Sequence, residues 1–170
     1  PESRHFFRRY DVGMTEQAPY QTVLQNLLLQ LRVAALGTVD EHAGPQVSMV
    51  PFALDRETGH LVIHVSTLST HPANLRKQAS AVLMVMQPEK AGTGVHALPR
   101  VSLQVEASFV DHDAALYGQT KEIYTNRFPD MAFMTDFADF SLVRLVPRSV
   151  RLISGFGAAR KIELSQWMGV

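Results

Sequence analysis

The chain has no cysteine, no net charge and no long apolar segment. Without cysteine among its 170 residues, disulfides and thiolate metal sites are excluded. Its 16 basic and 16 acidic side chains cancel, so no basic field is present to attract nucleic acid or an anionic membrane. No apolar run reaches the roughly 18 residues that a membrane-spanning helix needs. We therefore expect a cytoplasmic protein that binds a small molecule or another protein, with neither a nucleic-acid nor a membrane partner.

The length and the 46% hydrophobic content suit one compact domain. We expect residues 1–17 to form an N-terminal arm, to which we assign no structure, and residues 18–170 to form the domain. Hydrophobic periodicity and capping signals predict helices over 20–31, from Pro72 onward and over 113–126. Strands are predicted over 34–39, 46–54, 61–65, 81–86, 101–110, 140–146 and 150–153. Short connections without βαβ alternation predict a mainly β, α+β fold: an antiparallel barrel of six to seven strands with flanking helices.

Residues 64–75 join a strand end, a run of hydroxyls and a helix start. Pro72 suits the first helical turn, and Thr70 or His71 can cap it. Free backbone N–H groups and the positive end of a helix dipole favour an anion, and neighbouring hydroxyls add donors. The hydroxyls belong to Ser66, Thr67, Ser69 and Thr70. This pattern is typical of a phosphate site, and an ordinary hydroxyl-capped helix explains it equally well.

Six segments follow one another along residues 20–165 in a distinctive order. They are 36–40 (LGTVD), 44–52 (GPQVSMVPF), the hydroxyl-rich 64–75, 99–107 (PRVSLQVEA), 139–145 (DFSLVRL) and 155–160 (GFGAAR). In order and spacing they resemble the FMN-binding split-barrel family typified by pyridoxamine 5′-phosphate oxidase. The resemblance is greatest to the haem-utilisation branch of that family, the HugZ/HutZ-like proteins.

The resemblance implies a split barrel that holds FMN between the two subunits of a homodimer. Residues at matching cofactor-binding positions are Ser48, Met49, Val50, Pro51, Val65, Ser66, Ser69, Thr70, His71, Asn74 and Arg100. By this match, Met49, Val50 and Pro51 lie against the isoalloxazine ring, and residues 69–71 hold the phosphate. The oxidases carry Arg or Lys at some phosphate positions, so this chain has fewer fixed cations there.

Two of the matched residues carry charge. Histidine at position 71 would make the hold on the phosphate pH-sensitive, because its reference pKa is about 6.5; the alternative is a surface helix cap. Arg100 is expected to reach the phosphate or to stabilise a reduced flavin; the alternative is a solvated charge at a strand end.

The histidines depart from the family pattern. The oxidases carry a C-terminal Arg-x-His that helps to hold pyridoxal phosphate, and this chain has no histidine after His112. True pyridoxamine 5′-phosphate oxidase activity is therefore not expected. The same absence argues against the C-terminal histidine thought to bind haem in the haem-utilisation branch, which leaves His96 and His112 as candidates. No metal site is predicted. Met84 and Met86 share a strand face and are interpreted as core side chains.

Two classes of function remain open. The first is an FMN-dependent oxidoreductase of unknown small-molecule substrate, in which the protein supplies position and electrostatics. The alternative is a flavin- or haem-binding carrier, or haem-utilisation protein, without efficient turnover. No side chain is identified as a general acid or base.

Overall fold

The computed structural model describes residues 20–167, and the predicted N-terminal arm lies outside them. The helices are α1 (Tyr20–Gln30), α2 (His71–Lys77), η1 (Val95–Ala97), α3 (Tyr117–Arg127), η2 (Pro129–Asp136) and α4 (Leu164–Trp167). The strands are β1 (Val33–Val39), β2 (Pro45–Pro51), β3 (Ala53–Leu54), β4 (Leu61–Ser66), β5 (Ser80–Met86), β6 (Arg100–Val110), β7 (Phe140–Ile153) and β8 (Ala159–Ile162). No described helix is long and apolar enough to cross a membrane.

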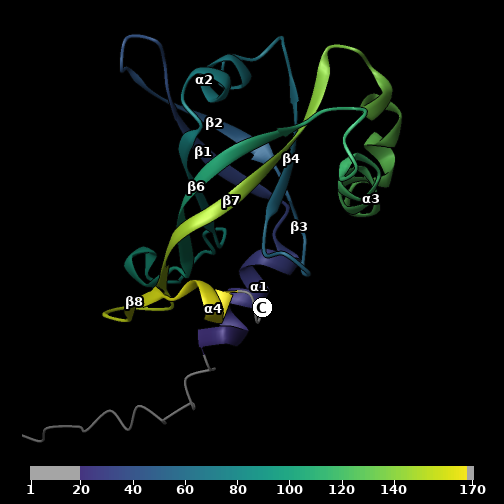
Figure 1. Cartoon of the computed structure of the whole chain (residues 1–170). Coiled ribbons are helices and arrows are strands. Elements are labelled where there is room, and N and C mark those ends of the chain that lie inside the picture. Colours follow the sequence, from purple (N-terminus) through teal and green to yellow (C-terminus); the bar gives the residue numbers. More distant parts are fainter. Residues whose placement is uncertain (1–19, 168–170) are drawn as a thin grey trace, which may run out of the picture.

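The eight strands form one curled antiparallel sheet. Its order is β2-β1-β5-β6-β7-β4-β3, and β8 pairs with β7 outside this path. Figure 1 shows α2 at the upper end of the curled sheet, α1 and α4 at the lower end, and α3 beside β4. The predicted α+β class and antiparallel split barrel are confirmed.

The main core fills the inside of the curled sheet. Alternate residues of the strands point inward, as in β5, where Ala81, Leu83 and Val85 are buried. Leu24, Leu27 and Leu28 of α1 pack into the same cluster. Trp167 of α4 also belongs to it, and its indole Nε1 donates to the carbonyl of Gly59 at 2.8 Å.

The element boundaries differ from the predicted ones where tertiary contacts intervene. The predicted strand 46–54 is interrupted at Phe52, whose side chain is fully buried and whose N–H donates to the carbonyl of Arg32. The predicted strands 140–146 and 150–153 form one strand, because a bulge accommodates Pro147: Val105 pairs with Pro147 and Gln104 with Ser149. Proline cannot donate to the ladder, so a bulge at this point is expected.

A second, smaller core lies between α3 and the outside of β3, β4 and β7. It contains Ala53, Val62, Tyr124, Phe128 and Leu142. The predicted helix 113–126 begins only at Tyr117, because the residues before it form turns. Loop 137–139 then returns to the barrel, where the carbonyl of Asp139 accepts a hydrogen bond from the N–H of Thr67.

Candidate functional site

The hydroxyl-rich segment forms a tight turn followed by α2, as predicted. Thr70 is the N-cap of α2 and Pro72 lies in its first turn, but the Thr70 side chain makes no capping bond. Ser66 is hydrogen-bonded within its own turn. Its Oγ accepts a hydrogen bond from the N–H of Leu68, and its carbonyl oxygen accepts one from the N–H of Ser69. Within residues 20–167, the N–H groups of Thr70, His71 and Ala73 are left without a backbone partner. The segment therefore keeps three backbone donors for an anion, in addition to its hydroxyls.

Asn74 connects α2 to the β1–β2 hairpin. Its side chain is 7% exposed, and its Nδ2 donates to Thr38 Oγ1 at 3.0 Å and to Gln46 Oε1 at 3.1 Å. Both donor positions of the amide are thus used inside the protein. The cofactor contact expected of Asn74 stays a prediction, and the structure gives it a structural role in addition.

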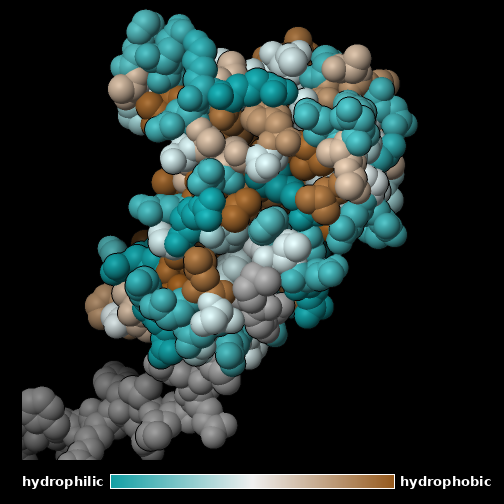
Figure 2. Space-filling view, viewed as in Figure 1, coloured by the Kyte–Doolittle hydropathy of each residue, from teal (hydrophilic) through white to brown (hydrophobic). Residues whose placement is uncertain are grey.

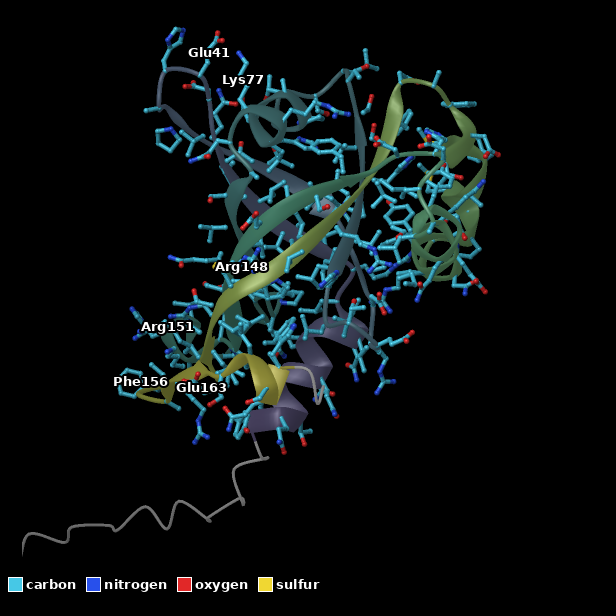
Figure 3. All side chains as sticks on the ribbon, viewed as in Figure 1. Glu41, Lys77, Arg148, Arg151, Phe156 and Glu163 are labelled. Carbon is cyan, nitrogen blue, oxygen red and sulfur yellow. The ribbon has the colours of Figure 1, made fainter. Side chains whose placement is uncertain are left out.

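The charges around the segment are unfavourable to an anion. A hollow of about 300 Å³ is lined by Ser69 and Thr70 together with Asp40, Glu41 and Lys77. Lys77 forms an ion pair with Glu41, and the two lie side by side at the upper end of the molecule (Figure 3). The backbone N–H groups of Gly44 and His42 lower the pKa of Asp40, which is therefore ionised at neutral pH. A phosphate dianion would meet two carboxylates and a single ammonium here, so FMN fits this hollow poorly.

His71 is buried at the start of α2, with 8% of its surface exposed. Burial lowers its pKa below the ordinary value of 6.5, because the charged imidazolium is penalised away from water. The lowered pKa favours the uncharged imidazole near neutral pH, whereas a phosphate bound beside it would raise the pKa again, so the pH-sensitive hold on a phosphate stays a prediction.

The structure disperses the remaining predicted site residues. The side chains of Val50 and Val65 belong to the main core, so only their backbone could contact a cofactor. Arg100 begins β6 and pairs with Met86, whereas Ser80, next to α2, begins β5. Six residues of strand separate these ends by roughly 20 Å. Arg100 is therefore distant from the 66–74 segment in one chain, and its assignment to a flavin phosphate stays a prediction that requires a second copy.

A second group of candidate site residues lies on the outer face of β1, β2 and β5. Cross-strand pairing aligns Met49, Ala35, Met84, Ser102 and Arg151 in one row across five strands. A parallel row holds Val47, Gly37, Val82, Gln104 and Ser149. Val47 is 75% exposed and Met49 67% exposed. An apolar face therefore points outward from these three strands.

Small residues along β1 leave two hollows in this face. A hollow of about 350 Å³ is lined by Ala35, Met49, Met84 and Met86 among others. An adjoining one of about 510 Å³ is lined by Gly37, Val82, Gln104 and Arg148 among others. We call the two together the β1 trough. Figure 2 shows the side of the molecule on which β6 and β7 lie in front of β1 and β2, and there too apolar side chains reach the surface between polar ones.

The β1 trough is bordered by cations on its β6–β7 side. Arg151 pairs with Ser102, and Arg100 pairs with Met86 and with Ile153. Figure 3 shows Arg148 and Arg151 on the same side of the molecule, along β7 toward β8. Arg148 is bound to Glu106 at 2.9 Å, whereas neither Arg100 nor Arg151 forms an ion pair with any residue between 20 and 167. Along the row from Met49 to Arg151, the surface thus changes from apolar to cationic.

The interpretation of Met84 and Met86 as core side chains is wrong. Both point outward, Met86 is 47% exposed, and the inward positions of the strand belong to Ala81, Leu83 and Val85. Both faces of this strand are apolar, so alternation alone could not decide which one is buried. In β6 the alternation is unambiguous: Val101, Leu103 and Val105 point into the core, and the polar Ser102, Gln104 and Glu106 lie between them.

Sequence reasoning also missed the buried pair beneath α3. Arg144 is 3% exposed, and its Nη1 donates to Asp55 Oδ2 at 2.7 Å while its Nε donates to Thr120 Oγ1 at 2.8 Å. The available signal was a lone arginine inside the apolar run 142–146. The pair holds α3 to the β3–β4 turn, on a different face from the β1 trough.

Comparison with known families identifies the family to which the chain belongs. A family model described as CREG, beta-barrel matches residues 21–169. The chain belongs to this family. Among curated relatives of this CREG β-barrel protein, Heme oxygenase HutZ of Vibrio cholerae serotype O1 is 30% identical over 129 residues, which are 75% of this chain and 72% of that protein. The predicted relationship to the haem-utilisation branch is confirmed.

Solved structures share the fold. A heme binding protein from Mycobacterium smegmatis has a TM-score of 0.78 at 21% identity; the match covers 89% of this chain and 61% of that one. A putative pyridoxamine 5′-phosphate oxidase from Listeria innocua has a TM-score of 0.61 at 15% identity and covers 80% of this chain and 99% of that one. The CREG β-barrel chain thus has the oxidase-like split barrel, while spanning about three fifths of the mycobacterial protein.

Proposed function

We propose that this chain binds haem on the outer face of β1, β2 and β5 and acts in haem utilisation, as a haem-binding or haem-degrading protein. The observation that carries the proposal is the β1 trough, where an apolar surface ends in unpaired arginines. HutZ is named a heme oxygenase, and the mycobacterial structure is that of a heme binding protein. Both names point to the same ligand.

The chemistry of haem matches the trough. Haem is a flat, largely apolar ring with two carboxylates on one edge and an iron that accepts nitrogen or sulfur ligands. Val47, Met49 and Met84 offer apolar contact area, and methionine adapts its shape to a flat ligand. Arg100 and Arg151 lie where the carboxylates would emerge, and charge-assisted bonds to guanidinium are among the stronger ones in proteins.

We propose further that two copies associate through this face. Exposed contiguous apolar patches mark interaction sites, and symmetric dimers bury the same patch of both subunits. Val47 at 75% and Met49 at 67% are the most exposed large apolar residues of this face. Light scattering at micromolar concentration should give twice the chain mass. A monomer that binds haem normally would overturn the shared face.

An FMN-dependent oxidoreductase is the second candidate. It is favoured by the oxidase-like fold and by the hydroxyls of Ser69 and Thr70. It is disfavoured by Asp40 and Glu41, which place negative charge beside those hydroxyls. When bound, FMN would supply hydride or electron transfer, and the protein would supply position.

Titration of the purified chain with ferric haem and, separately, with FMN decides between the two. Haem binding gives a shifted Soret band with a defined endpoint, and flavin binding changes the fluorescence of FMN. We expect saturable binding of haem and FMN binding at least roughly tenfold weaker. Adding a reductant under air then tests turnover: loss of the Soret band with a bilin-type product indicates degradation, and a stable band indicates a carrier. Tight FMN binding without haem binding would overturn the proposal.

A further inference from the structure

The middle of the β1 trough is occupied by one methionine between two small residues. Met84 lies on β5, and its cross-strand partners on the outer face are Ala35 and Ser102. Side chains stand roughly perpendicular to a sheet, so the thioether of Met84 projects outward between them. Val82 and Met86, two residues away along β5, are 46% and 47% exposed, whereas Met84 is only partly exposed.

Histidines are absent from this surface in the described chain. Those within residues 20–167 lie in the β1–β2 turn, in β4 and the turn before it, in α2, in η1 and after β6: His42, His64, His60, His71, His96 and His112. None belongs to β1, β2, β5 or β6. The soft donors on the trough are the thioethers of Met49, Met84 and Met86. Methionine sulfur is an established type of haem-iron ligand.

Among the three thioethers, Met84 has the favourable position. Met49 belongs to β2, which ends the sheet order, and 67% of it is exposed. Met86 ends its strand beside Arg100. A flat ring lying on the sheet would centre over the small residues Ala35 and Ser102, which leaves Met84 beneath its middle.

Arg151 lies in the same row, two strands from Met84. Neighbouring strands are about 4.8 Å apart, so their Cα atoms are separated by about 10 Å. Arg151 is exposed, and no described carboxylate pairs with it. Arg148, by contrast, is held by Glu106 through its Nε at 3.1 Å and its Nη2 at 2.9 Å. Arg151 is thus available to a carboxylate of a ligand centred on Met84.

We infer that Met84 supplies an axial thioether to the iron of haem bound in the β1 trough, and that Arg151 binds a haem carboxylate. This inference rests on the proposed haem function. The groups involved lie in one cross-strand row of the sheet: the thioether of Met84, its small neighbour Ser102 and the guanidinium of Arg151. In this assignment the iron is bound by the sulfur of a methionine and by no histidine of the described chain.

The iron ligand is tested by absorbance and magnetic circular dichroism of the chain titrated with ferric haem. The native protein should show the charge-transfer band of thioether-ligated ferric haem. Met84→Leu, which conserves volume, should lose that band and bind haem roughly tenfold more weakly. Met84→His should replace the band by a histidine signature. The control is Met131→Leu on η2, where Met131 is 37% exposed; it should change neither.

The carboxylate contact is tested with haem and haem dimethyl ester. Arg151→Ala should weaken haem binding roughly 10- to 100-fold and leave binding of the ester unchanged. Arg56→Ala, an exposed arginine in the β3–β4 turn, is the control. Equal weakening of both ligands would remove the carboxylate contact. If Met84→Leu keeps the native spectrum, the ligand assignment is wrong while haem binding stands; if the native chain binds no haem, the proposed function itself fails.

Discussion

Substitution of Asp55 by asparagine should expose the energetic role of the buried Arg144. Both side chains are only 4% exposed, and Arg144 Nη1 donates to Asp55 Oδ2 at 2.7 Å. The other oxygen of Asp55 accepts from the N–H of Glu57 at 3.0 Å, a bond that asparagine can keep. The new amide would direct N–H groups at a guanidinium, so the arginine charge would remain buried without a counter-ion.

The magnitude follows from the burial. Breaking a buried ion pair by removing one partner costs about 3–5 kcal/mol, because an uncompensated charge stays away from water. The guanidinium of Arg144 is already incompletely hydrogen-bonded, since its Nη2 has no partner in the described chain. His60 cannot compensate, because burial, followed by the Arg144 charge, lowers its pKa. Asp55→Asn should therefore lower the free energy of unfolding by about 3–5 kcal/mol.

Urea unfolding followed by fluorescence of Trp167 measures this loss. The matched control is Glu106→Gln, which breaks the exposed Arg148–Glu106 pair, 58% and 52% exposed, and should cost about 0–1 kcal/mol. The double variant Asp55→Asn/Arg144→Met also removes the uncompensated arginine charge, so it should recover part of the lost free energy of unfolding. Equal costs for Asp55→Asn and Glu106→Gln would refute the reasoning.

The same pair makes a pH prediction. Burial acts to raise the pKa of Asp55, but the hydrogen bonds from Arg144 and Thr58 outweigh it, so the pKa lies below its ordinary value. The unfolded chain then binds the proton more readily than the folded one. The contribution of Asp55 to stability should be complete above about pH 3.9 and disappear as the pH falls through the folded pKa. Asp55→Asn should flatten this part of the acid profile.

Three further outcomes are expected. Burial lowers the pKa of His64 to about 4, so stability should fall as the pH drops from about 6.5 toward 4, and His64→Phe should reduce that slope in urea unfolding at several pH values. Asn74→Ala should cost about 1–3 kcal/mol, because it leaves the buried hydroxyl of Thr38 without this donor, and unchanged urea stability would contradict this. Trp167→Phe removes the bond to the Gly59 carbonyl and should cost about 1–3 kcal/mol, measured by thermal unfolding followed by circular dichroism.

Alternation and turn chemistry predicted most of the fold. The hairpins, the Pro72 helix and the strands over 34–39, 61–65, 81–86 and 101–110 follow from patterns within a few residues of each other. The continuous β7 could not be predicted locally, because Pro147 is tolerated only by virtue of a bulge against β6. Likewise, the break at Phe52 depends on a hydrogen bond to Arg32 across the fold.

The candidate site was predictable only in part. The sequence drew attention to the hydroxyls of residues 66–70, but the charges beside them come from Asp40 and Glu41, some thirty positions earlier in the chain. At the β1 trough the sequence singled out Ser48, Met49 and Arg100 but not Met84, because β5 is apolar on both faces and only pairing with Ala35 and Ser102 shows that Met84 points outward. Cross-strand register is a property of the assembled sheet.

Filling the trough tests the central claim, that haem binds on the outer face of β1, β2 and β5. A Cβ at Gly37 would meet Val82 no closer than 3.6 Å, so Gly37→Leu should keep the fold and project into the trough. Gly118→Leu on α3 is the control, since nothing lies within 4 Å of a Cβ there. In a titration followed by the Soret band, Gly37→Leu should weaken haem binding at least roughly tenfold, and Gly118→Leu should match the native chain. Native affinity in Gly37→Leu, or no haem binding by the native chain, would contradict the claim.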